Sequence, residues 1–185
     1  MNEVPDDELM RLFQEGEVEA FDMLFERYRG PVYNFAWAML RNPASAEDVL
    51  QDTFLSVART AQQYEPRGCF RAWLMRITRN RCLNLASAEN LRRPIRQSDA
   101  LLQIRSDTVD PPDGVIVREQ MERIDDAIAK LPEHQREAIV LYAFEDMSYR
   151  EISDVLDMPI NTVKTLIHRA RATLAEALDE EGEER

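Results

Sequence analysis

Apolar residues recur at helical spacing along nearly the whole chain, and no stretch alternates apolar and polar residues as a half-buried β-strand would. The chain has only five glycines and nine prolines among 185 residues, which argues against a loop-rich or all-β fold. The sequence therefore predicts an all-α protein. We expect helices at residues 6–14, 17–41, 44–62, 70–90, 116–130, 133–144, 149–156 and 161–178.

Two local signals bear on the second and third of these helices. Gly30-Pro31 is expected to kink or break the second helix, because proline lacks the backbone N–H and its ring crowds the preceding turn. Ser45 with Asp48 three residues later has the spacing of a capping box at the start of the third helix.

The stretch 92–114 has proline near both ends, scattered charge and weak periodicity, which is typical of a linker. It separates residues 1–91 from residues 115–185, and both parts are large enough to fold alone. The acidic end, 179–185, is expected to be solvated and frayed. We therefore predict two small helical domains joined by a flexible linker.

The net charge of −12 is unevenly distributed along the chain. Residues 66–105 carry nine basic and two acidic side chains, a net charge of +7. Charges more than roughly 8 Å apart are largely screened at cellular salt, so a local basic surface still attracts phosphate. The acidic remainder should weaken non-specific binding, which favours a protein that a partner delivers to DNA.

Several classes of protein are not expected. Cys69 and Cys82 are the only cysteines, and we interpret them as two reduced thiols of a cytoplasmic protein. His134 and His168 lie far from them in sequence, so no metal site is predicted. No apolar run is long enough for a membrane span, and the acidic N-terminus does not resemble a secretory signal. The chain lacks a Gly-rich phosphate loop and any acid–base cluster, so we expect neither a cofactor nor an enzyme.

The most specific pattern lies at residues 147–174, MSYREISDVLDMPINTVKTLIHRARATL. Ser148 and Glu151 form a second capping box, and Met147 and Ile152 are spaced as a hydrophobic staple. The short first helix must end before Pro159, and a second helix begins near Asn161 or Thr162. Two short helices with a tight turn between them predict a helix-turn-helix.

The second of these helices separates apolar and polar residues between its faces. Val163, Ile167, Ala170 and Leu174 form one stripe, and no acidic residue occurs between Ile160 and Ala175. Such a helix can enter the major groove, where basic side chains bind phosphates or guanine and polar ones contact base edges. The predicted DNA-binding residues are Asn161, Lys164, Thr165, His168, Arg169 and Arg171.

A second basic surface is predicted on the helix at 70–85, FRAWLMRITRNRCLNL. Phe70, Trp73, Leu74, Ile77 and Leu85 form its core stripe, and several arginines project away from them. A cationic helix beside an aromatic-containing loop suits single-stranded DNA, because arginines track phosphates and aromatic rings stack on bases. Trp73 itself is expected in the core. The predicted contacts are Tyr64, Arg67, Arg71, Arg76, Arg79 and Asn80.

The helix at 44–62 has a buried stripe and an opposite face that mixes acids, an amide and an exposed leucine. This face is suited to a protein partner, although a single exposed leucine is common on any surface. Its residues are Asp48, Gln51, Asp52 and Leu55.

From Glu17 to Leu178 the chain resembles the extracytoplasmic-function (ECF) sigma factors of bacterial RNA polymerase. Four segments carry the resemblance in the family's order: AFDMLFERYRGPVYNFAWAML, SAEDVLQDTFLSV, FRAWLMRITRNRCLN and LPEHQREAIVLYAFEDMSYREISDVLDMPINTVKTLIHRAR. Three positions depart from the family's usual pattern. Asn161 and Leu166 replace a glycine and an arginine of the recognition helix, and Asn84 stands where an aspartate is usual.

The resemblance implies roles for the three surfaces. The N-terminal domain, sigma region 2, would bind the β′ clamp helices of core polymerase through Asp48, Gln51, Asp52 and Leu55, and would open the −10 promoter element. The loop 64–68 and the helix 70–84 would hold the unpaired bases. The C-terminal domain, region 4, would read the −35 element as duplex and meet the β flap. An anti-sigma factor is a further partner that the resemblance implies.

Two other functions remain open on the residues alone. A stand-alone helix-turn-helix regulator would explain residues 147–174, but it leaves 44–96 without a role. A helical adaptor for an acidic protein would show no salt-dependent affinity for DNA.

Overall fold

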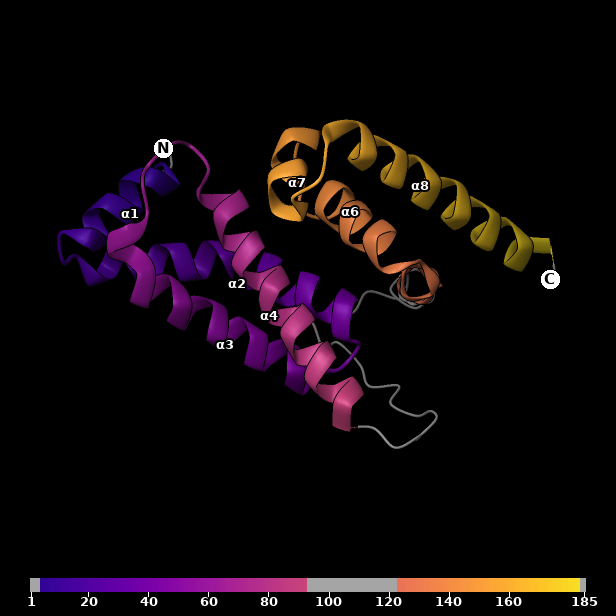
Figure 1. Cartoon of the computed structure of the whole chain (residues 1–185), viewed down its shortest axis with the longest axis horizontal. Helices are drawn as coiled ribbons and strands as arrows, with labels where there is room; N and C mark the ends of the chain where they lie inside the picture. Colours follow the sequence, from indigo (N-terminus) through magenta and orange to yellow (C-terminus); the bar gives the residue numbers. More distant parts are fainter. Residues whose placement is uncertain (1–3, 93–122, 184–185) are drawn as a thin grey trace, which may run out of the picture.

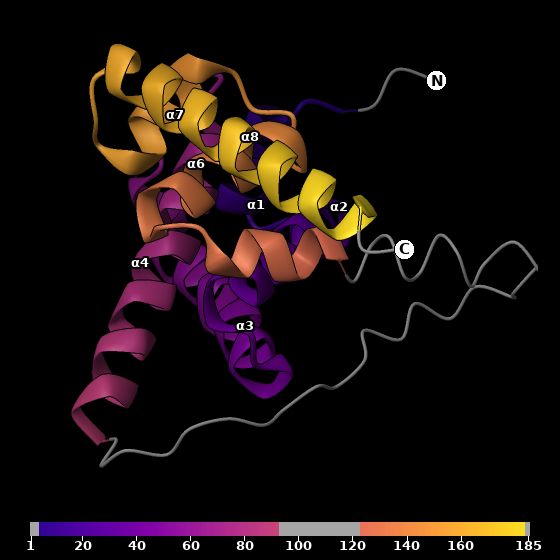
Figure 2. The same cartoon turned by 90° about the vertical axis from the view of Figure 1, so that its right-hand side faces the viewer.

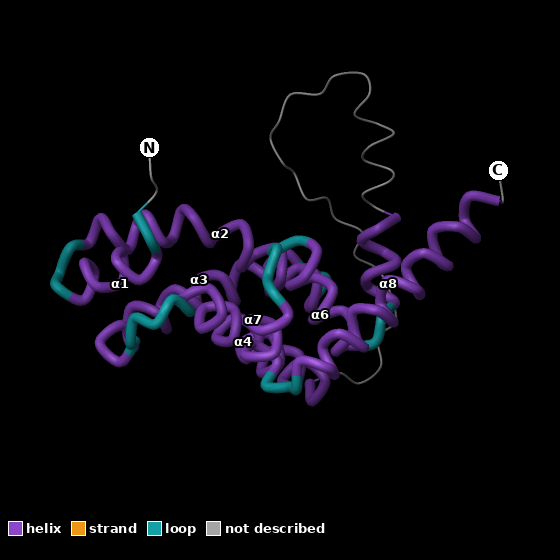
Figure 3. Tube along the Cα trace, turned by 90° about the horizontal axis from the view of Figure 1, so that it is seen from above, coloured by secondary structure: helices purple, strands orange, loops and turns teal. Residues whose placement is uncertain are grey.

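The computed structural model describes residues 4–92 and 123–183, and no strand occurs within these two ranges (Figure 3). We call them the N-terminal unit and the C-terminal unit. Apart from Arg92, the predicted linker lies outside the described residues. None of the described helices is long and apolar enough to span a membrane. The helices are α1 (Asp6–Gln14), α2 (Val18–Leu40), α3 (Pro43–Thr60), α4 (Phe70–Arg92), a helix at residues 123–130, α6 (Glu133–Ala143), α7 (Tyr149–Leu156) and α8 (Ile160–Glu183), with a 3₁₀ turn η1 (Ala61–Gln63) between α3 and α4.

The N-terminal unit is built around α2, which packs against α1, α3 and α4 (Figure 1). Phe21 and Phe25 of α2 meet Phe54 of α3 edge to face, with ring centroids 6.0 and 4.8 Å from Phe54. Such aromatic pairs add to the stabilisation that burial of their surface provides. The four helices that the spacing of apolar residues predicts in this unit are present, and their ends differ from the prediction by no more than two residues.

The structure departs from two local predictions for the N-terminal unit. Helix α2 is not broken at Gly30-Pro31 and continues to Leu40, with Val32 and Phe35 of the next turn buried in the core. The cap of α3 is Asn42 rather than Ser45. The Asn42 side chain accepts a hydrogen bond from the Ser45 backbone N–H, and Pro43 supplies the φ angle that suits a first helical residue.

The helix-turn-helix of the C-terminal unit forms as predicted. Ser148 and Glu151 close the capping box reciprocally at the start of α7. Asp157 ends α7 in the left-handed conformation with φ of 55°, and α8 begins three residues later. Helix α8 extends to Glu183, further than predicted, so most of the acidic end continues the helix.

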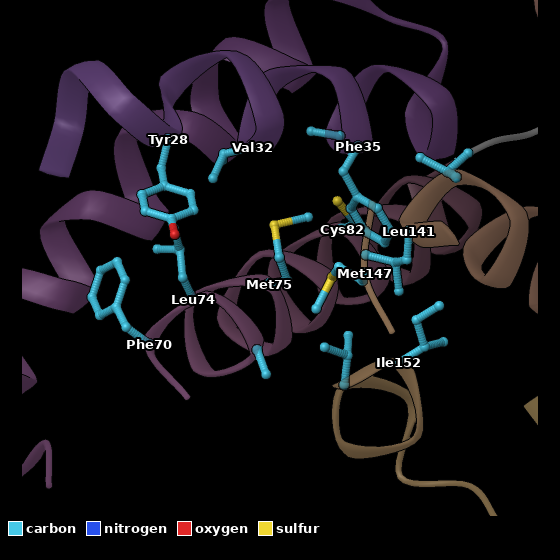
Figure 4. Close-up of a cluster of buried hydrophobic side chains, with 14 of the residues drawn as sticks. Tyr28, Val32, Phe35, Phe70, Leu74, Met75, Cys82, Leu141, Met147 and Ile152 are labelled. Atoms are coloured by element: carbon cyan, nitrogen blue, oxygen red, sulfur yellow. The ribbon is translucent and has the colours of Figure 1, made fainter. Parts of the chain in front are cut away.

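The two units share one hydrophobic core. Helix α4 packs against α7, and α2 packs against α6. Figure 4 shows Met75 and Cys82 of α4 in the same cluster as Leu141, Met147 and Ile152 of the C-terminal unit. Helix α8 packs against α6 and α7, on the outer side of the molecule (Figure 2). Helix α4 is thus central and helix α8 is peripheral.

Candidate nucleic-acid interface

Helix α8 turns its apolar stripe inward and its polar side chains outward. Val163, Ile167 and Ala170 are buried. Leu166 is half-buried against the core, so it does not replace the family's arginine as an exposed contact. The six side chains predicted to contact DNA are all exposed: Asn161, Lys164, Thr165, His168, Arg169 and Arg171.

Two tyrosines that the sequence analysis did not single out flank this face. Tyr142 of α6 and Tyr149 of α7 stack with ring centroids 5.3 Å apart. The guanidinium of Arg171 lies 4.7 Å from the Tyr142 ring centroid, and the Lys164 ammonium lies 5.9 Å from that of Tyr149. Cation–π contacts of this length limit the positions of both cations, which therefore lie along one edge of α8.

Two arginines of α4, Arg71 and Arg79, bond to acids of the C-terminal unit. Arg71 Nη2 donates to Glu151 Oε1 at 3.0 Å, and Arg79 Nε donates to Glu137 Oε1 at 2.6 Å. The Glu137 side chain is 1% exposed and that of Arg79 13% exposed, so this ion pair is almost fully buried. Both arginines are therefore paired with carboxylates of the C-terminal unit in this structure.

The remaining candidates of the second basic surface differ in exposure. Arg76 is exposed, and its Nε donates to the Asp154 carbonyl oxygen at 3.0 Å. Arg67 and Asn80 are also exposed, and Arg67 pairs with its neighbour Glu65.

Tyr64 does not lie where a base-stacking residue should lie. Its side chain is buried at 6% exposure, with its ring against Phe70 and Trp73. Its hydroxyl donates to the carboxylate of Asp7 on α1 at 2.5 Å. We therefore correct the prediction for Tyr64: its ring supports the loop and is not presented to a base.

The predicted partner surface on α3 is exposed along its whole length. Asp48, Gln51, Asp52 and Leu55 follow one another at helical spacing on the side away from α2 and α4. Leu55 is 50% exposed, so it adds apolar surface to this otherwise polar face. A shallow hollow beside Asp48 and Gln51 is lined by Pro43, Ala44 and Glu47.

Burial perturbs two groups where the units meet. Burial raises the pKa of Glu145 to about 7, and the nearby Arg71 opposes this effect only in part. Burial, reinforced by the Glu137 carboxylate, raises the pKa of the Cys82 thiol to about 12. Neither Cys82 nor Cys69 forms a disulfide.

Comparison with known proteins assigns the two units. Residues 24–92 match sigma-70 region 2, and residues 121–174 match sigma-70 region 4. The ECF RNA polymerase sigma factor SigK of Mycobacterium sp. (strain KMS) is 33% identical over 86% of this chain and 83% of its own length. The chain is an extracytoplasmic-function sigma factor. This sigma factor is also 31% identical to SigW of Bacillus subtilis (strain 168), over 89% of this chain and 92% of SigW.

Solved structures share the fold of this sigma factor. The structure of CnrH in complex with the cytosolic domain of CnrY superimposes with a TM-score of 0.74 at 28% identity, over 96% of this chain and 99% of that one. The sigma factor RpoE of Bartonella quintana superimposes with a TM-score of 0.70 at 23% identity, over 86% and 96% of the two chains. The second likeness supports the fold alone.

Several residues around the basic faces of this sigma factor were not found from the sequence. Glu137 and Glu151 pair with arginines of α4 that lie 58 and 80 positions away. Periodicity within one helix carries no information on such long-range partners. Tyr142 and Tyr149 gave only a weak signal in the sequence. Each is an aromatic residue in one of the two helices before α8, and packing in the core would explain such a residue equally well.

Proposed function

We propose that this sigma factor binds core RNA polymerase through Asp48, Gln51, Asp52 and Leu55 of α3. It directs the polymerase to promoters whose −35 element α8 reads as duplex, and α4 with the loop before it holds the unpaired bases of the −10 element. The domains that perform these tasks are residues 1–91 and 115–185, with 92–114 as the linker. The sigma factor acts in the cytoplasm, without a cofactor and without catalytic activity of its own.

The exposed face of α8 carries the proposal. The six outward side chains predicted to contact DNA are polar or basic, and the recognition helix has no carboxylate between Ile160 and Ala175. A helix that follows a capped helix and a tight turn, with its cations exposed, has the geometry needed to enter a major groove. A stand-alone regulator would share this face, but it would have no use for the exposed acidic side of α3.

DNA and the C-terminal unit compete for the arginines of α4. Arg71 and Arg79 are hydrogen-bonded to Glu151 and Glu137, so they are free for phosphate only after the units separate. Core polymerase supplies the free energy of separation by binding each unit at its own place. Two modest DNA contacts tied by one polymerase then act together through effective concentration.

An anti-sigma factor is the further partner that we propose. CnrH, which shares 28% identity with this chain, is in complex with the cytosolic domain of CnrY. An inhibitor bound in a comparable way would block the polymerase-binding face or keep the two units together.

Reconstitution with purified core polymerase tests the function. We expect a stable complex, and run-off transcription from a library of randomised promoters should enrich two sequence elements at a fixed spacing. If the chain forms no complex with core polymerase, or if the complex starts no transcripts, the proposed function is wrong.

The α3 surface has a direct test. Asp48→Ala with Asp52→Ala should weaken core binding by roughly tenfold, because each carboxylate contact at the rim of an interface contributes about 0.5–1 kcal/mol. Arg59→Ala, on the same exposed side of α3 but outside the proposed contact, is the matched control. Titration of labelled core polymerase measures both affinities, and equal affinities would place the binding surface elsewhere.

A further inference from the structure

Helix α1 holds the loop before α4 through a single carboxylate. Asp7 accepts a hydrogen bond from the Tyr64 hydroxyl at 2.5 Å and a second from the backbone N–H of Gly68. Gly68 has φ of +68°, a conformation that side chains disfavour, so the loop takes a specific and constrained path at this point. Asp7 therefore joins both ends of the segment 64–68 to α1.

The C-terminal end of α1 holds the start of the same segment. Gln14 Nε2 donates to the backbone carbonyls of Ala61 and Tyr64 at 2.7 and 2.9 Å. Gln62 Nε2 donates in return to the Gln14 carbonyl at 2.9 Å. The Ala61 carbonyl also accepts a hydrogen bond from the Tyr64 backbone N–H, so it has two donors. Helix α1 thus holds η1 and both ends of the segment 64–68.

Burial reinforces these hydrogen bonds. The Tyr64 ring lies 5.8 Å from that of Phe70 and 4.9 Å from that of Trp73. Burial, and then the hydrogen bond to Asp7, raises the pKa of Tyr64, so its hydroxyl remains a donor at any physiological pH. A hydrogen bond in such surroundings is poorly replaced by water.

A cavity of about 330 Å³ opens where α1, the loop and α4 meet. Asp7, Gly68 and Phe70 form part of its wall, and Arg71 and Glu151 complete it from α4 and α7. Asp7 thus shapes the hollow next to the loop as well as the path of the loop. Sequence periodicity assigned α1 no role beyond packing.

We propose that Asp7 is a positioning residue for promoter opening, which fixes the loop 64–68 in the form that receives unpaired bases. The inference rests on the proposed function, because that function gives the loop its ligand. A loop ordered before DNA arrives loses less conformational entropy on binding, so the contacts it makes contribute more to opening. Without Asp7 the loop has the same sequence but is no longer held in one conformation.

The test uses holoenzyme reconstituted with core polymerase and a promoter that the wild-type chain selects from a randomised library. Asp7→Ala should lower the amount of open complex on duplex promoter by roughly ten- to a hundredfold, as expected for loss of hydrogen bonds to a charged group. Its affinity for core polymerase and its binding to the −35 duplex should remain within about twofold of wild type, the scatter usual for a surface change away from both sites. Permanganate reactivity of unpaired thymines reports opening.

Templates with an abasic site distinguish positioning from general damage. When the base that the loop holds is removed, wild type and Asp7→Ala should open the promoter equally, because the variant has already lost that contact. With an abasic site at any other position, Asp7→Ala should still form less open complex than wild type. A defect that is the same at every abasic position would overturn the proposal, and so would normal opening by Asp7→Ala on the intact duplex.

Two further variants keep the test independent of folding defects. Tyr64→Phe removes one donor and keeps the ring, so it should show a smaller defect that adds nothing in the Asp7→Ala background. Glu8→Ala is the matched control, because Glu8 is exposed on the same helix and bonds only to Arg11 within α1. Additive defects would overturn the proposal. If the wild-type chain fails to bind core polymerase, the proposed function fails and this inference falls with it.

Discussion

Helix α4 and the part of α8 from Ile160 to Ala175 are both basic, yet their cations are in opposite situations. The cations of α8 are exposed, and two of them rest on tyrosine rings that attract them without neutralising their charge. Three arginines of α4, Arg71, Arg76 and Arg79, donate hydrogen bonds to carboxylates or to a carbonyl oxygen of the C-terminal unit. The number of basic residues in a segment therefore does not show whether they are available to bind DNA. Their availability depends on acidic residues that are distant in the sequence and close in the fold.

The difference follows from where the acids of the C-terminal unit lie. They are absent from the first turns of α8 and present on α6 and α7, where they face α4. The C-terminal unit thus presents a positive surface outward on α8 and a negative surface inward on α6 and α7. The inward surface is complementary to the same α4 arginines that we assign to the −10 element.

The largest effect is expected from the buried ion pair. Glu137→Ala would leave Arg79 without its partner in the shared core, and breaking a buried pair in this way costs about 3–5 kcal/mol. We expect the units to separate, which small-angle X-ray scattering would record as a larger radius of gyration.

The matched control for Glu137→Ala is an exposed pair between the same two units. Asp126 bonds to Arg41 at 3.0 Å with its side chain 62% exposed. Asp126→Asn should cost below about 1 kcal/mol and leave the scattering unchanged. Equal responses of the two variants would show that burial does not distinguish these contacts.

A somewhat smaller effect is expected at the exposed face. Lys164→Ala with Arg169→Ala should weaken binding to the −35 duplex by about 2–4 kcal/mol, since each well-placed contact to DNA contributes about 1–3 kcal/mol. Binding to core polymerase should not change. Affinity is measured by fluorescence anisotropy with holoenzyme at fixed salt. Normal transcription from a promoter that needs the −35 element would contradict our choice of recognition helix.

The smallest effect concerns pH. The pKa of Glu145 is raised to about 7 from 4.5, so the folded state binds more protons than the unfolded state between these values. The free energy of unfolding therefore falls through this carboxyl as pH rises from about 4.5 to 7, by about 1–2 kcal/mol. Glu145→Gln should stabilise the protein relative to wild type at pH 8 and have little effect at pH 4.5. Thermal unfolding at both values checks the sign, and a gain confined to low pH would contradict it.

The sequence was most informative where structure is local. The capping box of Ser148 and Glu151 was correct because both partners lie within one turn. The cap of α3 is also a local feature, and Asn42 followed by Pro43 is a common sequence pattern at a helix start. Ser45 and Asp48, one turn later, have the spacing of a capping box and were chosen instead. Close alternatives of this kind explain why helix ends are harder to place than helices.

Contacts between distant segments account for what the sequence did not reveal. Tyrosine is a residue type that can stack on bases, so the sequence made Tyr64 a candidate. Only the structure shows that Tyr64 is buried between α1 and α4. Asp7 looks like an ordinary first-turn acid that favours the helix dipole. Its bond to Gly68 joins residues 61 positions apart. The proposed sites on α3 and α8 needed no such partner, so their exposure followed from periodicity alone.

The position of Cys82 makes the opening of this sigma factor chemically observable. Its thiol is buried between the two units, and its high pKa keeps it protonated, so it should resist maleimide while the units are together. Separation would expose the sulfur and lower its pKa toward the ordinary value. In a Cys69→Ser variant, the rate at which Cys82 is labelled should therefore report how often the two units separate, and no spectroscopic probe has to be attached.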